Sequence, residues 1–201
     1  MILLTFVSLI PSLVYLKNVK MPSGEDLIYY KELKYLKTHA PPTSYLFEPD
    51  KDPEYGVLAG WDLGDAINYI AEKPNIGNNL IYPPMFEGVQ RTIDLLMSTE
   101  PEKAYARMKE LSIRYVIVRP MPYWIVRKYA SLTNFRITDF FDFDKETKKQ
   151  IIKGLYYEIL NNRLLFSREK KYGNFRLVRE SPEKTEIYGN IASIIRIFEI
   201  E

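Results

Sequence analysis

Apolar residues recur along this chain at two spacings, one typical of helices and one of strands. Between Glu25 and Lys37 they return every three or four residues with charged residues between them, which predicts an amphipathic helix whose tyrosines join the core. The same spacing predicts helices over 63–72, 86–97, 124–132 and 145–160, and another that ends near Leu111. Short apolar or β-branched runs predict strands over 55–59, 114–118, 175–178, 185–188 and 194–198. We therefore expect one compact α+β domain, with a helix-rich core and short strands concentrated toward the C-terminus.

Two of these helices begin with residues that are typical of N-caps. Asp62 precedes the predicted helix over 63–72, and its carboxylate could accept hydrogen bonds from the first free backbone N–H groups. The run Thr99-Glu100-Pro101-Glu102 has the spacing of a capping box and predicts the start of the helix that ends near Leu111.

The first sixteen residues, Met1 to Leu16, are uncharged and nearly all apolar. The run is shorter than the roughly 20 residues that a bilayer-spanning helix needs, and Pro11 interrupts it. It also lacks the basic start and the cleavage site of a signal peptide. We interpret residues 1–20 as the end of a transmembrane helix that begins outside this sequence, and residues 21–201 as a globular domain. The alternative is a buried N-terminal core segment.

Composition narrows the chemistry that this chain could perform. Its 201 residues include 46% hydrophobic ones, enough for a substantial core, and 28 basic side chains nearly balance 26 acidic ones. The net charge of +2 gives no reason to expect a nucleic-acid partner. Because cysteine is absent, disulfides, zinc–thiolate sites and thiol nucleophiles are excluded. The one histidine, His39, precedes Ala40-Pro41-Pro42 and is predicted to end a helix.

Several segments, read in order, resemble the catalytic subunit of archaeal-type oligosaccharyltransferases, in its C-terminal globular domain. The run from Tyr55 to Gly64 is similar to the family signature, in which two tryptophans, an aspartate, a tyrosine and a glycine follow a buried strand. Further similar segments keep the family's order: Ile70 to Pro74, Asn78-Asn79, Lys109 to Val118, Phe175 to Ser181 and Ile195 to Glu199. The resemblance spans Glu25 to Glu201.

This resemblance implies a pocket for the hydroxyl of the serine or threonine two residues after an acceptor asparagine. Trp61 and Asp62 occupy the second and third motif positions, while Gly60 replaces the first tryptophan and Leu63 replaces the tyrosine as possible pocket neighbours. An indole N–H and a carboxylate suit a hydroxyl, which both accepts and donates a hydrogen bond. From the residues alone, Trp61 and Asp62 could equally be a core tryptophan and a helix cap.

A second family element places an aspartate after the strand at 114–118 and a lysine several residues later. Arg119 stands where the aspartate is expected, and Lys128 lies in the stretch that resembles the lysine-containing one. The resemblance therefore implies that Lys128 supports the pocket. Asp144 and Lys148, which have roughly helical spacing, are the alternative pair.

The family transfers an oligosaccharide from a lipid-linked donor to asparagine in Asn-x-Ser/Thr sequences of an acceptor polypeptide. Its divalent metal, Mn or Mg, and its catalytic carboxylates lie in a membrane portion that this sequence lacks, so we expect no catalytic residue and no cofactor in this chain. The resemblance implies a place at the cell membrane, with the globular domain on the extracytoplasmic face. The alternative is a diverged, non-catalytic binding or assembly module with the same fold, which the replacements at Gly60, Leu63 and Arg119 would also fit.

Overall fold

The computed structural model describes most of the chain between residues 24 and 201. The described residues are 24–44, 46, 51–77, 86–98, 100–120, 123–132, 136–143, 150–152, 171–172, 174–187 and 190–201. The predicted membrane segment at residues 1–20 therefore lies outside them. Among the described residues, no helix combines the length and apolar character that a bilayer crossing requires.

A five-stranded mixed sheet organises the fold. Its strands lie in the order β1 (Gly56–Leu58), β2 (Ile113–Val118), β9 (Arg196–Ile200), β6 (Phe175–Glu180) and β5 (Lys171–Tyr172). β1 and β2 are parallel, and the remaining neighbours are antiparallel. Two small two-stranded sheets accompany it, β3 (Phe141–Phe143) with β4 (Gln150–Ile152), and β7 (Lys184–Ile187) with β8 (Asn190–Ser193).

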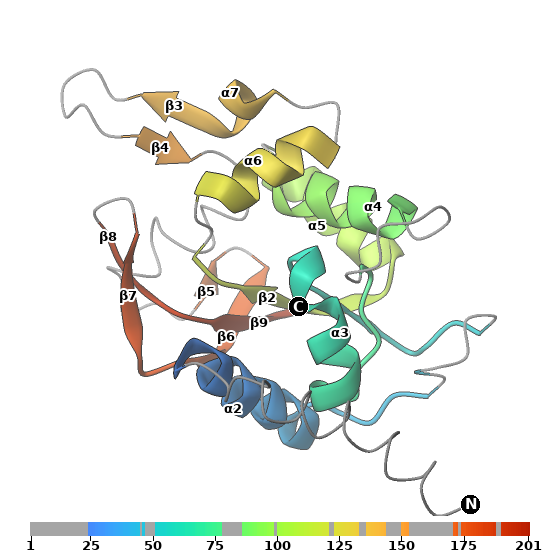
Figure 1. The fold of residues 1–201 in the computed structure, drawn as a ribbon. Coiled ribbons are helices and arrows are strands. Elements are labelled where there is room, and N and C mark those ends of the chain that lie inside the picture. The colour runs from blue at the N-terminus through green and yellow to red at the C-terminus, as the bar shows by residue number, and fades with distance from the viewer. Residues whose placement is uncertain are drawn as a thin grey trace, which may run out of the picture.

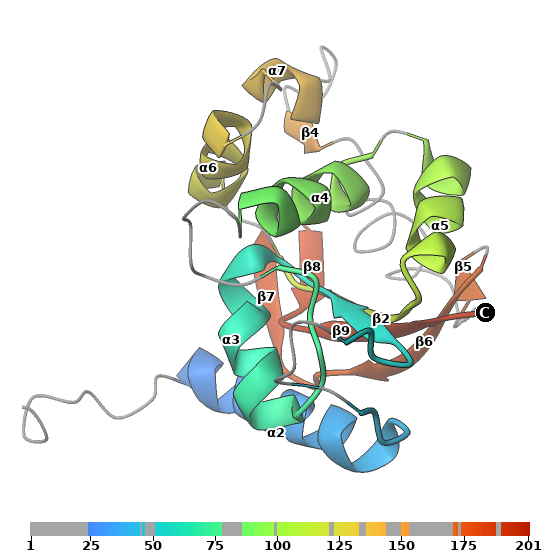
Figure 2. The same ribbon diagram turned by 90° about the vertical axis from the view of Figure 1, so that its right-hand side faces the viewer.

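Helices cover both faces of this sheet (Figures 1 and 2). One face carries α2 (Gly24–His39) and the segment formed by a 3₁₀ turn (Trp61–Leu63), α3 (Gly64–Ala66) and a π-helical turn (Ile67–Ala71). The other face carries α4 (Phe86–Leu96), α5 (Pro101–Glu110) and α6 (Tyr123–Leu132), and α7 (Ile137–Phe140) follows α6. The internal strand β2 is buried on both sides, which explains why its sequence is an almost continuous apolar run.

These layers enclose two apolar clusters. The first lies between the sheet and α4–α6 and includes Val116 and Val118 of β2. The second lies between the sheet and α2 and includes Tyr115 and Ile117. Alternate residues of one strand thus serve opposite cores, as the two-residue period of a strand requires. The structure confirms the predicted α+β class, with strands concentrated toward the C-terminus.

Most predicted helices and strands are observed, but the helix predicted over 145–160 is wrong where it can be assessed. Gln150–Ile152 form β4, which pairs in antiparallel fashion with β3. Ile151 and Ile152 are β-branched and fit an extended pair better than a helix. The other residues of that predicted helix, including Lys148, lie outside the described residues, and so does Asp144.

The two predicted caps also require correction. The predicted helix over 63–72 is present as a succession of 3₁₀, α and π turns that starts at Trp61, and Asp62 lies inside its first turn without capping it. α5 begins at Pro101 behind Glu100, which makes no side-chain capping bond, and Thr99 lies outside the described residues. Proline suits this first helical position because it has no N–H to satisfy.

Tyr30 of α2, which was predicted to join the core, is exposed.

Candidate functional site

The site begins where the two parallel strands end. Trp61 and Asp62 follow β1 after the short link Ala59-Gly60, and Arg119 directly follows β2. Because parallel strands run in the same direction, their carboxyl ends lie at the same edge of the sheet, which is a common position for ligand sites in sheets of this kind. The topology therefore brings together Asp62 and Arg119, which are 57 residues apart in the sequence.

Asp62 and Arg119 form an ion pair at this edge. The Nη2 group of Arg119 donates to Oδ2 of Asp62, and both side chains are mostly buried, with 15% and 25% of their surface exposed. Nη1 of Arg119 lies 3.5 Å from the hydroxyl of Tyr29, and the guanidinium lies 5.6 Å from the centre of the Tyr29 ring. Arg119 thus joins the sheet edge, the 3₁₀ turn and α2.

Lys128 of α6 covers Trp61. Its Nζ atom lies 4.4 Å from the centre of the Trp61 ring, a distance at which an ammonium group is attracted to the face of an indole. Trp61 itself is buried against α4 and α6, whereas Lys128 is exposed. The structure therefore places the three predicted acceptor-binding residues, Trp61, Asp62 and Lys128, in one site.

Gly60 is needed in this site for steric reasons. A β-carbon at Gly60 would lie 2.8 Å from the hydroxyl oxygen of Tyr129 and 2.9 Å from Oδ1 of Asp62, closer than real contacts allow. Tyr129 thus fills the space into which a larger residue at position 60 would extend. Leu63 does not join the site, because it is buried in the cluster beneath α2.

Two buried polar atoms of the site have no hydrogen-bond partner among the residues that the structure describes. They are Nε1 of Trp61, a donor, and Oδ1 of Asp62, an acceptor. An unmade hydrogen bond costs a buried polar group about 1–3 kcal/mol, so each of these atoms calls for a partner, which a water molecule or a ligand group would supply. A hydroxyl group could satisfy either atom, provided that Lys128 or Arg119 moves to admit it.

Sequence reasoning found Trp61, Asp62 and Lys128 but missed how Arg119 acts. It treated Arg119 as the loss of an expected aspartate, whereas the structure shows a cation that holds Asp62. Tyr29 and Tyr129 were missed too, because neither contact follows from spacing along the chain. The parallel pairing of β1 and β2 would have revealed the Asp62–Arg119 contact, had it been inferred from the sequence.

Metal binding gains no support from this part of the chain. Within the described ranges, no three acidic or histidine side chains come together in a way that could hold a metal ion. Cavities lined by described residues also lie away from Trp61 and Asp62, among them one between α2 and the sheet.

The fold and the site together define a class of protein: a globular α+β domain with a Trp-Asp pair at the carboxyl end of its first parallel strand pair. Residues 27–121, which include β1, β2, Trp61, Asp62 and Arg119, match the AglB core domain. The matched residues are thus similar to the AglB core of archaeal oligosaccharyltransferases, and the chain has the fold of their C-terminal globular domain.

The chain is also similar in sequence to a known glycotransferase. The chain is 27% identical over 152 residues to dolichyl-phosphooligosaccharide-protein glycotransferase 1 of Archaeoglobus fulgidus, an alignment that covers 74% of this chain and 24% of the relative. The chain therefore spans about a quarter of that enzyme's length.

Solved structures share the fold. The C-terminal globular domain of an oligosaccharyltransferase from A. fulgidus matches with a TM-score of 0.56 and 19% identity, covering 91% of this chain and all of that one. An A. fulgidus oligosaccharyltransferase tethered to an acceptor peptide containing the sequon NVT matches with a TM-score of 0.53 and 13% identity, covering 89% and 33%.

Proposed function

We propose that this chain supplies acceptor recognition to an oligosaccharyltransferase and that it has no transferase activity alone. The observation that carries this proposal is a pair of buried polar atoms on Trp61 and Asp62, at the positions of the family's acceptor-binding motif, that have no partner in the part of the chain that the structure describes. A donor and an acceptor on consecutive residues suit the hydroxyl of the serine or threonine in Asn-x-Ser/Thr. A relative with the same fold has been solved tethered to such a peptide.

Recognition of a hydroxyl by buried polar groups is selective. A peptide with alanine in place of threonine would leave the polar atoms of the site unpaired, whereas threonine would satisfy them. Lys128 lies over the Trp61 ring and Arg119 binds Oδ2 of Asp62, so a peptide hydroxyl that reaches both residues would displace at least one of the two cations. The acceptor site thus opens when the peptide binds.

The remaining parts of the reaction belong to the rest of such an enzyme. By analogy with the relatives, the lipid-linked oligosaccharide, the divalent metal and the catalytic carboxylates would lie in a membrane portion, to which residues 1–20 would connect this domain. The domain would then lie on the extracytoplasmic face of the cell membrane.

A second candidate function is a non-catalytic binding or assembly module. Two observations favour it: Gly60 has no room for the family's first tryptophan, and Arg119 already occupies Oδ2 of Asp62. If the site no longer admits a hydroxyl, the fold survives for its interactions alone.

Fluorine NMR separates these two functions. The chain contains two tryptophans, Trp61 and Trp124, so labelling with 5-fluorotryptophan gives two signals that a Trp124→Phe variant assigns. We expect an Asn-Val-Thr peptide to shift the Trp61 signal, and the matched Asn-Val-Ala peptide to leave it in place.

Two carboxylate variants control this experiment. Asp62→Asn should abolish the threonine-dependent shift, while Asp65→Asn, which changes a neighbouring carboxylate of the same segment, should retain it. Equal responses to the two peptides, or no response at Trp61, would favour the assembly module instead.

A further inference from the structure

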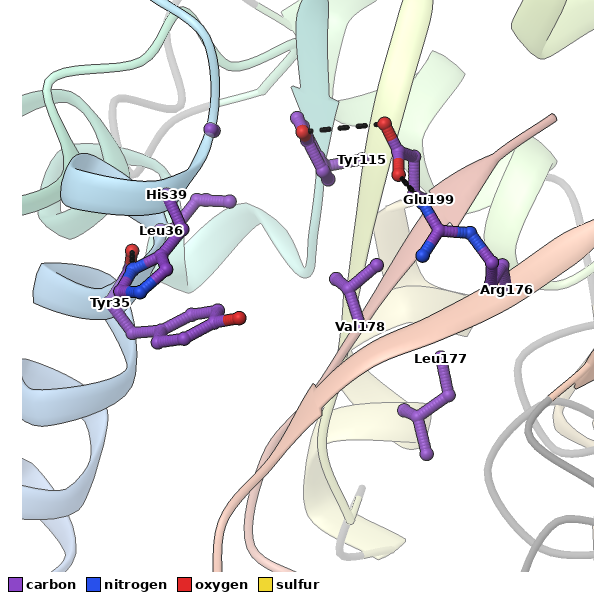
Figure 3. A pocket seen from close by; sticks show the side chains of 9 residues that line it. Tyr35, Leu36, His39, Tyr115, Arg176, Leu177, Val178 and Glu199 are labelled. Carbon is purple, nitrogen blue, oxygen red and sulfur yellow. Dashed lines mark hydrogen bonds and ion pairs between the residues drawn. The ribbon is translucent and has the colours of Figure 1, made fainter.

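A second site with binding chemistry lies between the C-terminal end of α2 and the sheet. It is a cavity of about 520 Å³, within the range of about 300–1,000 Å³ that is usual for small-molecule sites. Its lining comes from α2, β2, β6 and β9, and Figure 3 shows the open space between the helix and the strands. Its lining includes Tyr35, His39, Tyr115, Arg176, Val178 and Glu199.

One wall of this cavity is a polar row that crosses three strands. Tyr115, Glu199 and Arg176 occupy directly opposed positions on β2, β9 and β6. The Glu199 carboxylate accepts from the Tyr115 hydroxyl at 3.5 Å and from Nε of Arg114 at 2.9 Å, and its other oxygen pairs with Arg176. The row therefore offers donors and acceptors side by side, and it is held in place by its own bonds.

The opposite wall is a fixed aromatic stack on α2. The rings of Tyr35 and His39 are 3.9 Å apart and nearly parallel, and the guanidinium of Arg179 lies 4.7 Å from the centre of the Tyr35 ring. Arg179 is itself anchored to the buried Glu32, with its Nε atom at 2.6 Å from the carboxylate. In Figure 3 the Tyr35 hydroxyl points from the helix toward the strands. Nδ1 of His39 bonds within the helix, which leaves Nε2 unpartnered among the described residues.

The chemistry of these walls selects the ligand. The charges of the row are paired with one another: Glu199 binds the guanidinium groups of Arg114 and Arg176, and Nε of Arg176 also lies 3.4 Å from the Glu201 carboxylate. Neither an anion nor a cation would therefore gain a strong net attraction there. Hydroxyl groups, which donate to a carboxylate and accept from a guanidinium, satisfy both at once. Leu36, Ala40 and Val178 add apolar surface against which C–H groups can pack. We propose that this cavity is a binding site for one or two units of a neutral saccharide.

This saccharide site is separate from the acceptor site. Tyr115 and Arg119 are four residues apart on or beside β2, or about 13 Å at the rise of a strand. On α2, Tyr29 contacts Arg119, while Tyr35 and His39 lie at the other end of the helix. A saccharide and an acceptor peptide could therefore bind at the same time, and the proposal stands whether or not the chain recognises sequons.

Saturation-transfer NMR on the full chain tests the proposal. The probes are methyl β-glucoside, methyl α-mannoside and N-acetylglucosamine, with glucuronate as the charged comparison. We expect transfer to at least one neutral probe, with no change in the Trp61 fluorine signal. Tyr35→Phe removes only a hydroxyl and should weaken binding about fivefold, the value of one neutral hydrogen bond. Tyr30→Phe, an exposed tyrosine of the same helix outside the cavity, is the matched control and should bind as the wild type does.

A change of preference gives a readout that mere loss of structure would not produce. Glu199→Gln removes the carboxylate partner of Arg114 and leaves Arg176 with Glu201 alone, so it should weaken the neutral probe and strengthen glucuronate. The proposal is overturned if no neutral probe receives saturation, if wild-type protein prefers glucuronate, or if Tyr35→Phe and Tyr30→Phe behave alike.

Discussion

The two ends of α2 and β2 carry two differently organised sites. At the Asp62 end, two buried polar atoms have no partner among the described residues, while Arg119 binds the other oxygen of Asp62 and Lys128 lies over the Trp61 ring. At the Glu199 end, the polar side chains are already paired around an open cavity. The first site must break contacts before it can bind, whereas the second is preformed. We infer that buried polar atoms without hydrogen-bond partners favour a ligand that can pair with them. Polar side chains that are already paired around a cavity instead form a binding surface that needs no rearrangement.

The largest expected effect on stability comes from adding a side chain at Gly60, in the site formed by Trp61 and Asp62. Gly60→Ala places a β-carbon 2.8 Å from the Tyr129 hydroxyl oxygen and 2.9 Å from Oδ1 of Asp62. Because core overpacking typically costs about 1–3 kcal/mol, we expect a loss of that size in the free energy of unfolding. Gly60→Trp, which restores the family's motif, should cost more. Chemical denaturation measures both.

A glycine elsewhere and a second-site change make this prediction specific. Gly24→Ala is the control, since a β-carbon there meets nothing within 4 Å. In a Tyr129→Phe background, where one of the clashing atoms is absent, Gly60→Ala should cost less than in the wild type. An equal cost in both backgrounds would contradict the steric explanation.

The second prediction concerns a substitution that frees Asp62 without adding atoms to the site. Arg119→Gln removes the partner of a mostly buried carboxylate, which should lower the free energy of unfolding by about 1–3 kcal/mol, between the values of exposed and fully buried pairs. Under the proposed acceptor function it should also increase the response of Trp61 to the Asn-Val-Thr peptide, because Oδ2 of Asp62 is released. Fluorine NMR and denaturation follow the two effects.

A matched ion pair at the other end serves as the control. Arg179 pairs with the buried Glu32 through two contacts of 2.6 and 3.1 Å, and it also stacks on Tyr35. Arg179→Gln should lower stability comparably but affect saccharide binding rather than the peptide response. If both variants changed the peptide response equally, Arg119 would have no special role in the acceptor site.

Sequence patterns predicted the elements better than the contacts between them. The helix on 24–39 and the strand on 113–118 followed directly from apolar spacing, because each buries surfaces whose period is written into the residues. The strand at Gln150–Ile152 was missed because its apolar residues also fit a helical period, and only the pairing with β3 decides between the two.

For the two sites as well, the sequence predicted single residues better than the contacts between them. Trp61 and Asp62 could be found because they are neighbours in a motif, and Lys128 because a resemblance pointed to it. The partner of Asp62 could not be predicted, because Arg119 meets it only through the parallel pairing of β1 with β2. The polar row at the cavity joins residues 115, 176 and 199, whose alignment depends on strand register rather than on sequence distance.

A smaller effect concerns the protonation of a tyrosine near the cavity end. Burial, followed by the neighbouring Tyr115, raises the pKa of Tyr55 from 10.0 to about 12. A raised folded-state pKa stabilises the fold fully below pH 10, and this contribution is lost as the pH rises through about 12. We expect the free energy of unfolding to fall more steeply between pH 10 and 12 in the wild type than in Tyr55→Phe. If the free energy of unfolding of the two proteins depended on pH in the same way, burial would not raise the pKa of Tyr55.

The smallest effect concerns the cover of Trp61. Lys128 is exposed, and a cation over an aromatic ring contributes about 0.5–1 kcal/mol in such positions, so Lys128→Gln should cost no more than that in stability. Its clearer signature should be a shift of the Trp61 fluorine signal in the free protein, because the ammonium 4.4 Å from the ring centre is gone. Lys34→Gln, which removes a cation 5.6 Å from the exposed Tyr30 ring, is the control and should leave that signal in place. If Lys128→Gln also left the Trp61 signal unchanged, Lys128 would not cover the indole in solution. Arg119 would then be the one cation among the described residues that contacts the Trp61–Asp62 pair.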